Sequence, residues 1–256
     1  MVKRGFFAAV LVVGCAGADP EAVGEQQNAL GGSDLAVDFS GCTEFAGIGF
    51  VPAANARPLV PARYTLAGDA SNAVIVVRTA QCDQTRIAGR RSPRGTLSQI
   101  GINLVGPDST ADINNYTLWY TTTDPLLAAA LLSKGVRAEP DPSLRFVLRP
   151  SSTGGTLSVK DDPLRAPAYQ LLGPVVTPTA APVAFTASWW QDGLAGSSQM
   201  RTVLPAIRFS SGTMTLTTDP RSAFGRLIGG ASLTFPLLDS YNSFDSAHLV
   251  VHQSAP

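Results

Sequence analysis

Residues 97–105 read Leu-Ser-Gln-Ile-Gly-Ile-Asn-Leu-Val, and side chains of two kinds alternate along this stretch. The alternation sets Leu97, Gln99, Gly101 and Asn103 against Ser98, Ile100, Ile102 and Leu104. A period of two is typical of a β-strand, because successive side chains point to opposite faces of a sheet. The stretch therefore predicts a strand and directs attention to β architecture in the rest of the chain.

Further segments carry β-branched runs or alternating side chains between turn residues, as strands do. A Val/Ile run predicts a buried strand over 73–81, and an aromatic, Thr-rich segment predicts another over 113–122. Other predicted strands span residues 144–148, 156–160, 183–191, 200–209, 213–218 and 247–253. Turn pairs such as Gly154-Gly155 separate them.

Two segments, 123–135 and 219–230, predict short helices. Each contains Asp-Pro near its start and Gly at its end; Asp caps a helix, Pro suits the first turn and Gly ends it. Each also follows a Thr-rich strand, so the repeated strand–Thr-Asp-Pro–helix pattern either marks two related halves of one sheet system or is a coincidence. We expect a mainly β fold, an antiparallel barrel or sandwich with two short helices.

Composition excludes several classes of protein. The 256 residues include 19 Lys and Arg against 19 Asp and Glu, and 45% are hydrophobic. A chain this apolar is not disordered, and without a basic excess it has no electrostatic basis for binding nucleic acid. No apolar run reaches the roughly 20 residues that span a bilayer.

The N-terminus has the form of an export signal. Lys3 and Arg4 precede the apolar run 6–13, which is of signal-peptide length. The run leads into Leu-Val-Val-Gly-Cys at 11–15, which resembles a bacterial lipobox. The resemblance implies cleavage before Cys15 and acylation of that cysteine.

Two cleavage patterns remain open. In the first, the chain is a lipoprotein of the bacterial cell envelope, anchored to the membrane through Cys15. Ala16 after the cysteine then implies the outer membrane, by analogy with sorting in Gram-negative bacteria. In the second, an ordinary signal peptide is cut near Ala18 and Cys15 is discarded.

The first pattern divides the chain into three parts. Residues 1–14 form the signal peptide, and residues 15–40, which are small, polar and acidic, form a lipidated flexible tether. Residues 41–256 form a single β-rich domain. Within it, the Pro-rich segment 174–182 is interpreted as a surface loop rather than a linker.

The two remaining cysteines, Cys42 and Cys82, suggest one disulfide, because exported proteins fold in oxidising compartments. Closing a loop of about 40 residues would stabilise the chain by roughly 3–4 kcal/mol. The alternative is a metal-binding pair, but neither His nor an acidic cluster accompanies these cysteines.

Common catalytic motifs are absent from the sequence. It contains no GxSxG, no HExxH and no Gly-rich phosphate loop, so we predict no cofactor. His248 and His252 share a face of a helix or strand, but no third ligand accompanies them, so we predict no metal site. Asp161 and Asp162 would point to opposite faces of a strand, which favours a turn over an acid/base pair.

Two aromatic pairs, Trp119-Tyr120 and Trp189-Trp190, are the candidate ligand-binding residues. Adjacent residues on a strand face opposite ways, so one member of each pair packs in the core while the other lies outward or lines a cavity. Packing of both in the core is the alternative. A cavity of this kind would suit a small apolar or carboxylate-bearing molecule.

The order of segments resembles the acetoacetate decarboxylase-like superfamily over about residues 42–252. Residues 57–66 (RPLVPARYTL) followed by the strands 73–81 and 97–105 look like that family's opening. The helix 125–134 sits where the family has a helix before its catalytic loop. The resemblance implies a cavity-containing β fold and decarboxylation of a β-keto acid.

The lysines depart from that family's pattern. Its decarboxylases form a Schiff base on a Lys whose pKa is lowered by an adjacent Lys. Beyond the leader this sequence has only Lys134 and Lys160, and neither has a Lys neighbour. Lys134 is the one catalytic candidate, although a cation at a helix C-terminus also suits the helix dipole.

Three functions follow from these patterns. The favoured one is an exported, membrane-anchored lipoprotein whose barrel-like domain binds a small molecule. The others are an acetoacetate decarboxylase-like enzyme and a surface interaction lipoprotein without a ligand cavity.

Overall fold

The computed structural model describes residues 34–193, 196–235 and 241–254. The predicted signal peptide, the lipobox with Cys15 and most of the predicted tether lie outside these residues. Residues 35–40, the last part of the predicted tether, instead begin the first strand. Among the described residues, no helix combines the length and apolarity needed to cross a membrane.

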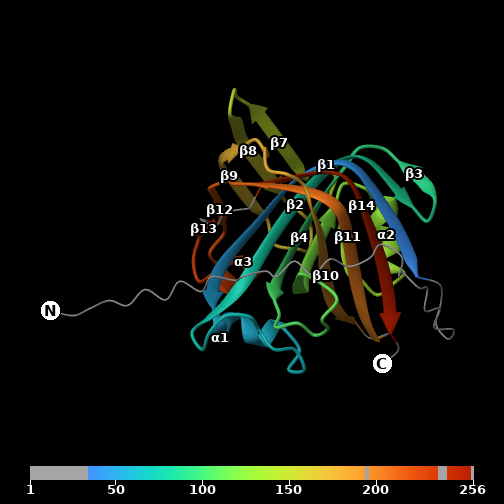
Figure 1. The fold of residues 1–256 in the computed structure, drawn as a ribbon. Coiled ribbons are helices and arrows are strands. Elements are labelled where there is room, and N and C mark those ends of the chain that lie inside the picture. The colour runs from blue at the N-terminus through green and yellow to red at the C-terminus, as the bar shows by residue number, and fades with distance from the viewer. Residues whose placement is uncertain (1–33, 194–195, 236–240, 255–256) are drawn as a thin grey trace. The chain divides into compact units, whose positions relative to one another are not determined.

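Seven long strands close into a barrel, which confirms the predicted mainly β, barrel-like fold (Figure 1). They are β1 (Leu35–Pro52), β2 (Asn72–Ile87), β4 (Gly95–Asn103), β5 (Ile113–Thr122), β10 (Val183–Gly193), β11 (Gly196–Ser210) and β14 (Tyr241–Ser254). The order is β1-β14-β11-β10-β5-β4-β2, and β2 pairs back onto β1. Two short strands extend it, β3 (Arg90–Ser92) on β2 and β6 (Ala138–Pro140) on β5.

Neighbouring barrel strands are antiparallel, with the exception of β5 and β10, which run parallel. A parallel pair cannot be joined by a tight turn and needs a long crossover. The crossover builds part of a second, antiparallel sheet of order β13-β12-β9-β8-β7. Its strands are β7 (Arg145–Pro150), β8 (Gly154–Asp161), β9 (Tyr169–Val176), β12 (Met214–Thr218) and β13 (Ser232–Phe235).

The fold has two hydrophobic cores. One fills part of the barrel interior, with side chains such as Leu97, Tyr120 and Val251. The other lies between the outer face of the barrel and the second sheet, where Ile100 of β4 packs in the same cluster as Leu157 of β8. Strands β2 and β4 therefore bury both of their faces.

In the described part of the chain, three α-helices accompany the strands: α1 (Ala53–Ala56), which continues into a 3-10 turn at Arg57–Leu59, α2 (Pro125–Leu132) and α3 (Ala223–Ile228). The Asp124 carboxylate caps α2 by accepting from the backbone N–H groups of Leu126 and Leu127 at 2.9 and 3.3 Å. Ser222, rather than Asp219, caps α3, and Gly229 ends it at φ +74°. The expectation of two helices was thus one short.

The alternation at 97–105 is confirmed, and both of its faces are buried. Ile100 and Ile102 belong to the outer core, whereas Leu97 belongs to the barrel core. Opposite β4, a β-bulge interrupts β5: Ile100 pairs with Trp119 but Gly101 pairs with Thr117, which leaves Leu118 as the extra residue. The bulge exchanges the faces of the side chains that follow it.

Five strands were missed by sequence reasoning: the longer strands β1 and β9 and the short strands β3, β6 and β13. Strand β9 runs to Val176, so the first three residues of the predicted surface loop 174–182 belong to a strand. The two Thr-rich strands that precede the predicted helices, β5 and β12, belong to different sheets. The Thr-Asp-Pro pattern therefore does not mark two halves of one sheet system.

Candidate ligand cavity

The barrel interior contains a cavity of about 480 Å³. All seven barrel strands contribute to its wall. The lining side chains are those of Glu44, Ala46, Ile48, Val76, Arg78, Asn103, Asp112, Ile113, Asn115, Phe185, Ala187, Trp189, Thr202, Leu204, Ile207, Phe209 and Asn242. The cavity lies beside the packed part of the barrel core, to which several of these residues belong.

Partly exposed apolar side chains mark the mouth of the cavity. Ile48, Ile113, Phe185 and Phe209 are all half-buried, and the acidic Asp112 next to Ile113 is exposed. The two Phe rings meet edge to face with centroids 5.6 Å apart. Deeper lining residues such as Trp189 are buried. A ligand that enters would pass apolar surface before it reaches the interior.

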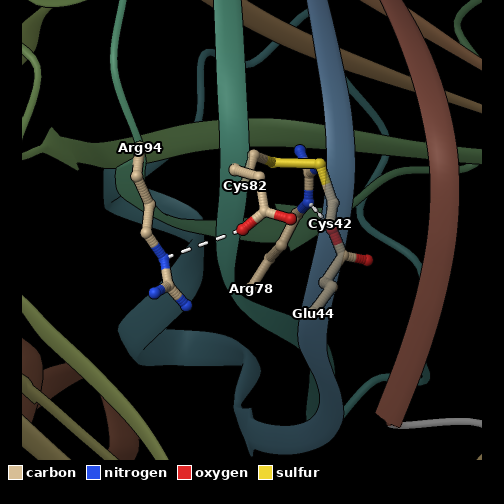
Figure 2. The surroundings of a disulfide bond; sticks show 6 residues. Cys42, Glu44, Arg78, Cys82 and Arg94 are labelled. Carbon is tan, nitrogen blue, oxygen red and sulfur yellow. Dashed lines mark hydrogen bonds and ion pairs between the residues drawn. A yellow bond between two sulfur atoms is a disulfide. The ribbon is translucent and has the colours of Figure 1, made fainter.

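An ion pair between Arg78 of β2 and Glu44 of β1 forms part of the wall. The two side chains are only 12% and 7% exposed. The remaining carboxylate oxygen of Glu44 accepts from the Asn242 amide at 3.3 Å. Figure 2 shows the pair beside the disulfide, on the same two strands. Protein atoms cover most of both side chains, so each charge depends on its partner.

Cys42 and Cys82 form the predicted disulfide. They lie directly opposite each other in the β1–β2 register, with Cα atoms 4.1 Å apart, and both belong to the barrel core. The bond therefore links the two strands that carry Glu44 and Arg78.

The structure separates the four predicted aromatic residues. Trp189 lines the cavity, whereas Trp190 faces outward and its indole N–H donates to the Asn114 side chain at 3.2 Å. Tyr120 is buried in the barrel core and does not line the cavity. Trp119 packs on the outer core, 5.6 Å from the Phe224 ring between centroids. The bulge at Leu118 explains why Trp119 faces outward.

Neither of the two lysines in the described part of the chain lines the cavity. Lys134 lies just after α2, half-buried, and its backbone carbonyl accepts from the Ser198 hydroxyl at 2.5 Å. Lys160 lies on β8 of the second sheet, 3.7 Å from the Asp162 carboxylate.

The two histidines lie on the outside of the barrel. Nδ1 of His248 is 2.7 Å from the Asp38 carboxylate, and Nδ1 of His252 is 2.9 Å from that of Asp34. Within residues 34–254, leaving out the two undescribed gaps, no group of three or more His, Cys, Asp or Glu is placed to hold a metal.

Sequence reasoning missed a buried carboxylate pair, Asp141 and Asp161, between the barrel and the second sheet. Asp161 is 3% exposed and accepts from the Thr121 hydroxyl at 2.6 Å. Burial, with a contribution from Asp141, raises the pKa of Asp161 to about 7, although the bond from Thr121 opposes the rise. The sequence analysis considered only the neighbouring pair Asp161 and Asp162 and predicted a turn, whereas Asp161 ends strand β8 and its carboxylate partner is the distant Asp141.

Comparison with known proteins identifies solved structures of similar fold. No protein-family model matches the chain, and no curated protein sequence matches it either. Solved structures do match. Acetoacetate decarboxylase from Legionella pneumophila superposes with a TM-score of 0.54 at 8% identity, covering 86% of each chain.

Two further structures extend the likeness. An acetoacetate decarboxylase-like enzyme from Sphingomonas wittichii RW1 gives a TM-score of 0.55 at 10% identity, covering 94% of this chain and 99% of the other. The enduracididine biosynthesis enzyme MppR, complexed with pyruvate, gives 0.53 at 12% identity over 89% and 91%. The chain shares the acetoacetate decarboxylase fold, as the sequence resemblance implied.

Proposed function

We propose that this chain is a binding protein that holds a small molecule inside its barrel. The cavity of about 480 Å³ carries the proposal. Pockets for small ligands typically measure roughly 300–1,000 Å³ and combine apolar walls with a few polar groups. The wall described above has that composition. A purely structural or surface-interaction role would give no reason for a cavity at this place.

An acetoacetate decarboxylase-like activity is the second candidate, and the shared fold favours it. Its Schiff-base chemistry would need an amine inside the cavity. Since neither Lys134 nor Lys160 lines the wall, we place binding first. Borohydride added with acetoacetate should leave the protein mass unchanged, and a covalent adduct on either lysine would restore the enzymatic candidate.

Binding can be tested with N-phenyl-1-naphthylamine, an uncharged probe whose fluorescence rises in apolar sites. We expect the protein to enhance its emission saturably. Thr202→Phe should weaken this binding, because Thr202 lines the cavity. Arg201→Phe is the matched control, since Arg201 is the exposed neighbour on the same strand. Equal binding by both variants would contradict the proposal.

We also propose that the protein is anchored to the bacterial cell envelope through lipid on Cys15. The support is the sequence pattern at 11–15 together with the disulfide, which suits an exported protein. Mass spectrometry of the mature protein should find residue 15 at the N-terminus carrying diacylglycerol. Cys15→Ser should release the protein from membranes. A mature N-terminus beyond residue 15 would contradict the anchor.

A further inference from the structure

We infer that the ligand is an uncharged, largely apolar molecule that offers one oxygen acceptor, such as a ketone, ester or amide carbonyl, to Trp189 and Asn115. The inference rests on the proposed binding function and specifies the class of ligand. Three features of the cavity carry it: two buried donors without acceptors, a wall whose only cation is already paired, and an apolar mouth.

The first feature is a pair of hydrogen-bond donors. The indole Nε1 of Trp189 and the amide Nδ2 of Asn115 are buried, and neither has an acceptor among the described residues. Both residues belong to the cavity wall, but the two nitrogen atoms are themselves covered by other protein atoms, so a ligand oxygen reaches them only once the wall shifts slightly. Strands β10 and β5 are paired in parallel with Trp189 opposite Asn115, so the two donors come from adjacent positions on the same face.

The orientation of the Asn115 amide follows from its neighbours. The Asn103 amide nitrogen donates to the backbone carbonyl of Asn114 at 2.8 Å, and a carbonyl can only accept. The same nitrogen donates to Oδ1 of Asn115 at 3.1 Å. This fixes the oxygen of Asn115 toward Asn103 and leaves its NH₂ group as the donor without a protein acceptor.

Such donors are rare because a buried N–H without an acceptor is costly, by about 1–3 kcal/mol. Trp189 is 2% exposed and Asn115 is fully buried. Both groups only donate, so the complementary ligand group is an acceptor. An oxygen between adjacent strands, which lie about 4.8 Å apart, could accept from both.

The second feature is charge. Arg78 is the only basic residue among the lining side chains, and it already forms an ion pair with Glu44. Asp112, an exposed residue just before β5, adds a further negative charge to the wall. A carboxylate would meet this surplus of negative charge, or would have to take Arg78 from Glu44 and leave a buried carboxylate unpaired. An uncharged carbonyl avoids both costs.

The third feature is the mouth, where Ile48, Ile113, Phe185 and Phe209 offer apolar contact. The polar end of the ligand therefore faces the interior, and its hydrocarbon part faces the mouth.

The test uses displacement of N-phenyl-1-naphthylamine by 2-octanone, octane and octanoate. Trp189→Phe keeps an aromatic ring, although a smaller one, and removes the N–H. It should weaken 2-octanone about five- to tenfold and change octane by less than about twofold. Trp190→Phe is the matched control, because the indole N–H of Trp190 already donates to Asn114. Asn115→Leu should act in the same direction as Trp189→Phe.

Charge is tested separately with Glu44→Gln, which frees Arg78. The variant should bind octanoate at least about tenfold more tightly than the unmodified protein does, with little change for 2-octanone. Equal weakening of octane and 2-octanone by Trp189→Phe and by Asn115→Leu would overturn the inference. So would tight octanoate binding by the unmodified protein. Failure of the naphthylamine and of 2-octanone to bind at all would instead overturn the proposed function.

Discussion

At the scale of single residues, the Arg78–Glu44 pair sets the electrostatics of the cavity. Removing two charges from water is costly, and their attraction offsets that cost only while both are present. While the pair is intact, Glu44 neutralises Arg78, the only basic residue that lines the cavity. Under the proposed binding function, we therefore expect the pair to affect selectivity among ligands more than stability.

Loss of one partner should be much worse than loss of both. Glu44→Gln leaves the guanidinium of Arg78 nearly buried without a counter-charge, and we expect the free energy of unfolding to fall by about 3 kcal/mol. The double variant Glu44→Leu with Arg78→Met should be close to the unmodified protein. Urea unfolding followed by circular dichroism measures both. A double variant less stable than either single one would show that the pair itself stabilises the fold.

Asp161 should make stability depend on pH. Its pKa of about 7 in the folded chain lies above the value of about 3.9 for an unfolded Asp. The contribution of Asp161 to the free energy of unfolding is therefore fully present below about pH 4. It is lost as the pH rises towards 7, at up to ~1.4 kcal/mol per pH unit. Burial acts in the same direction on Asp141, but hydrogen bonds from Ser143, Asp161 and the backbone of Asp162 lower its pKa, so Asp141 stays charged in this window.

Asp161→Asn should remove that part of the pH dependence, because an amide mimics the protonated acid at every pH. Urea midpoints measured between pH 4 and 7.5 should fall less steeply for this variant than for the unmodified protein. Asp162→Asn serves as the control, since that side chain is 56% exposed. Parallel curves for Asp161→Asn and the unmodified protein would show that Asp161 is ionised throughout.

At the scale of elements, strand β4 shows how far sequence patterns reach. Alternation predicted the strand and correctly separated its two faces. It did not predict that polar Gln99 is buried within the barrel, where its amide donates to Thr117 at 3.0 Å, while Ile100 faces a second core. Alternation identifies the two faces of a strand, but whether both faces are buried depends on whether a second sheet covers the first.

Strand β1 was missed for a related reason. Gly41, at φ +61°, interrupts its alternation, and Gly47 and Gly49 argue against a strand by propensity. Gly47 is needed because a Cβ there would lie 2.6 Å from the Phe235 ring of β13. Such glycines are needed where another element approaches closely, and this approach can be seen only in the assembled fold.

Gly101 of β4 has the same role beside the cavity. A Cβ at this position would lie 2.3 Å from the Tyr116 carbonyl oxygen and 2.8 Å from the Trp189 indole. We expect Gly101→Ala to destabilise the protein by about 2–3 kcal/mol and to alter Trp fluorescence. Gly95→Ala, on the same strand, meets nothing closer than 3.7 Å and should stay within about 0.5 kcal/mol. Equal stabilities would mean that the bulge relaxes freely.

At the scale of the whole molecule, the cavity depends on closure. Glu44, Asn115 and Trp189 come from β1, β5 and β10 and share a wall only because β2 returns to β1. The sequence indicated the fold and the disulfide, and it included Trp189 among its aromatic candidates. It could not indicate Arg78, Glu44 or Asn115, since nothing local distinguishes an inward polar residue from an outward one.

The disulfide should stabilise that closure. It joins strands β1 and β2 across a sequence separation of 40 residues, at a directly paired position in the barrel. Restricting the unfolded chain by such a loop is worth about 3–4 kcal/mol. The double variant Cys42→Ala with Cys82→Ala should lose this amount in urea unfolding. Reduction with dithiothreitol should lower the stability of the unmodified protein similarly and leave that of the variant unchanged.

Binding should respond differently from stability. The register between β1 and β2 extends from Val37 to Pro52 on one strand and from Asn72 to Ile87 on the other. In the absence of urea, this pairing should hold Glu44 and Arg78 in place without the disulfide. The affinity of the double cysteine variant for N-phenyl-1-naphthylamine should therefore differ from that of the unmodified protein by less than about threefold. A large loss of affinity in a variant that still folds would show that the bridge, rather than the strand pairing, shapes the cavity.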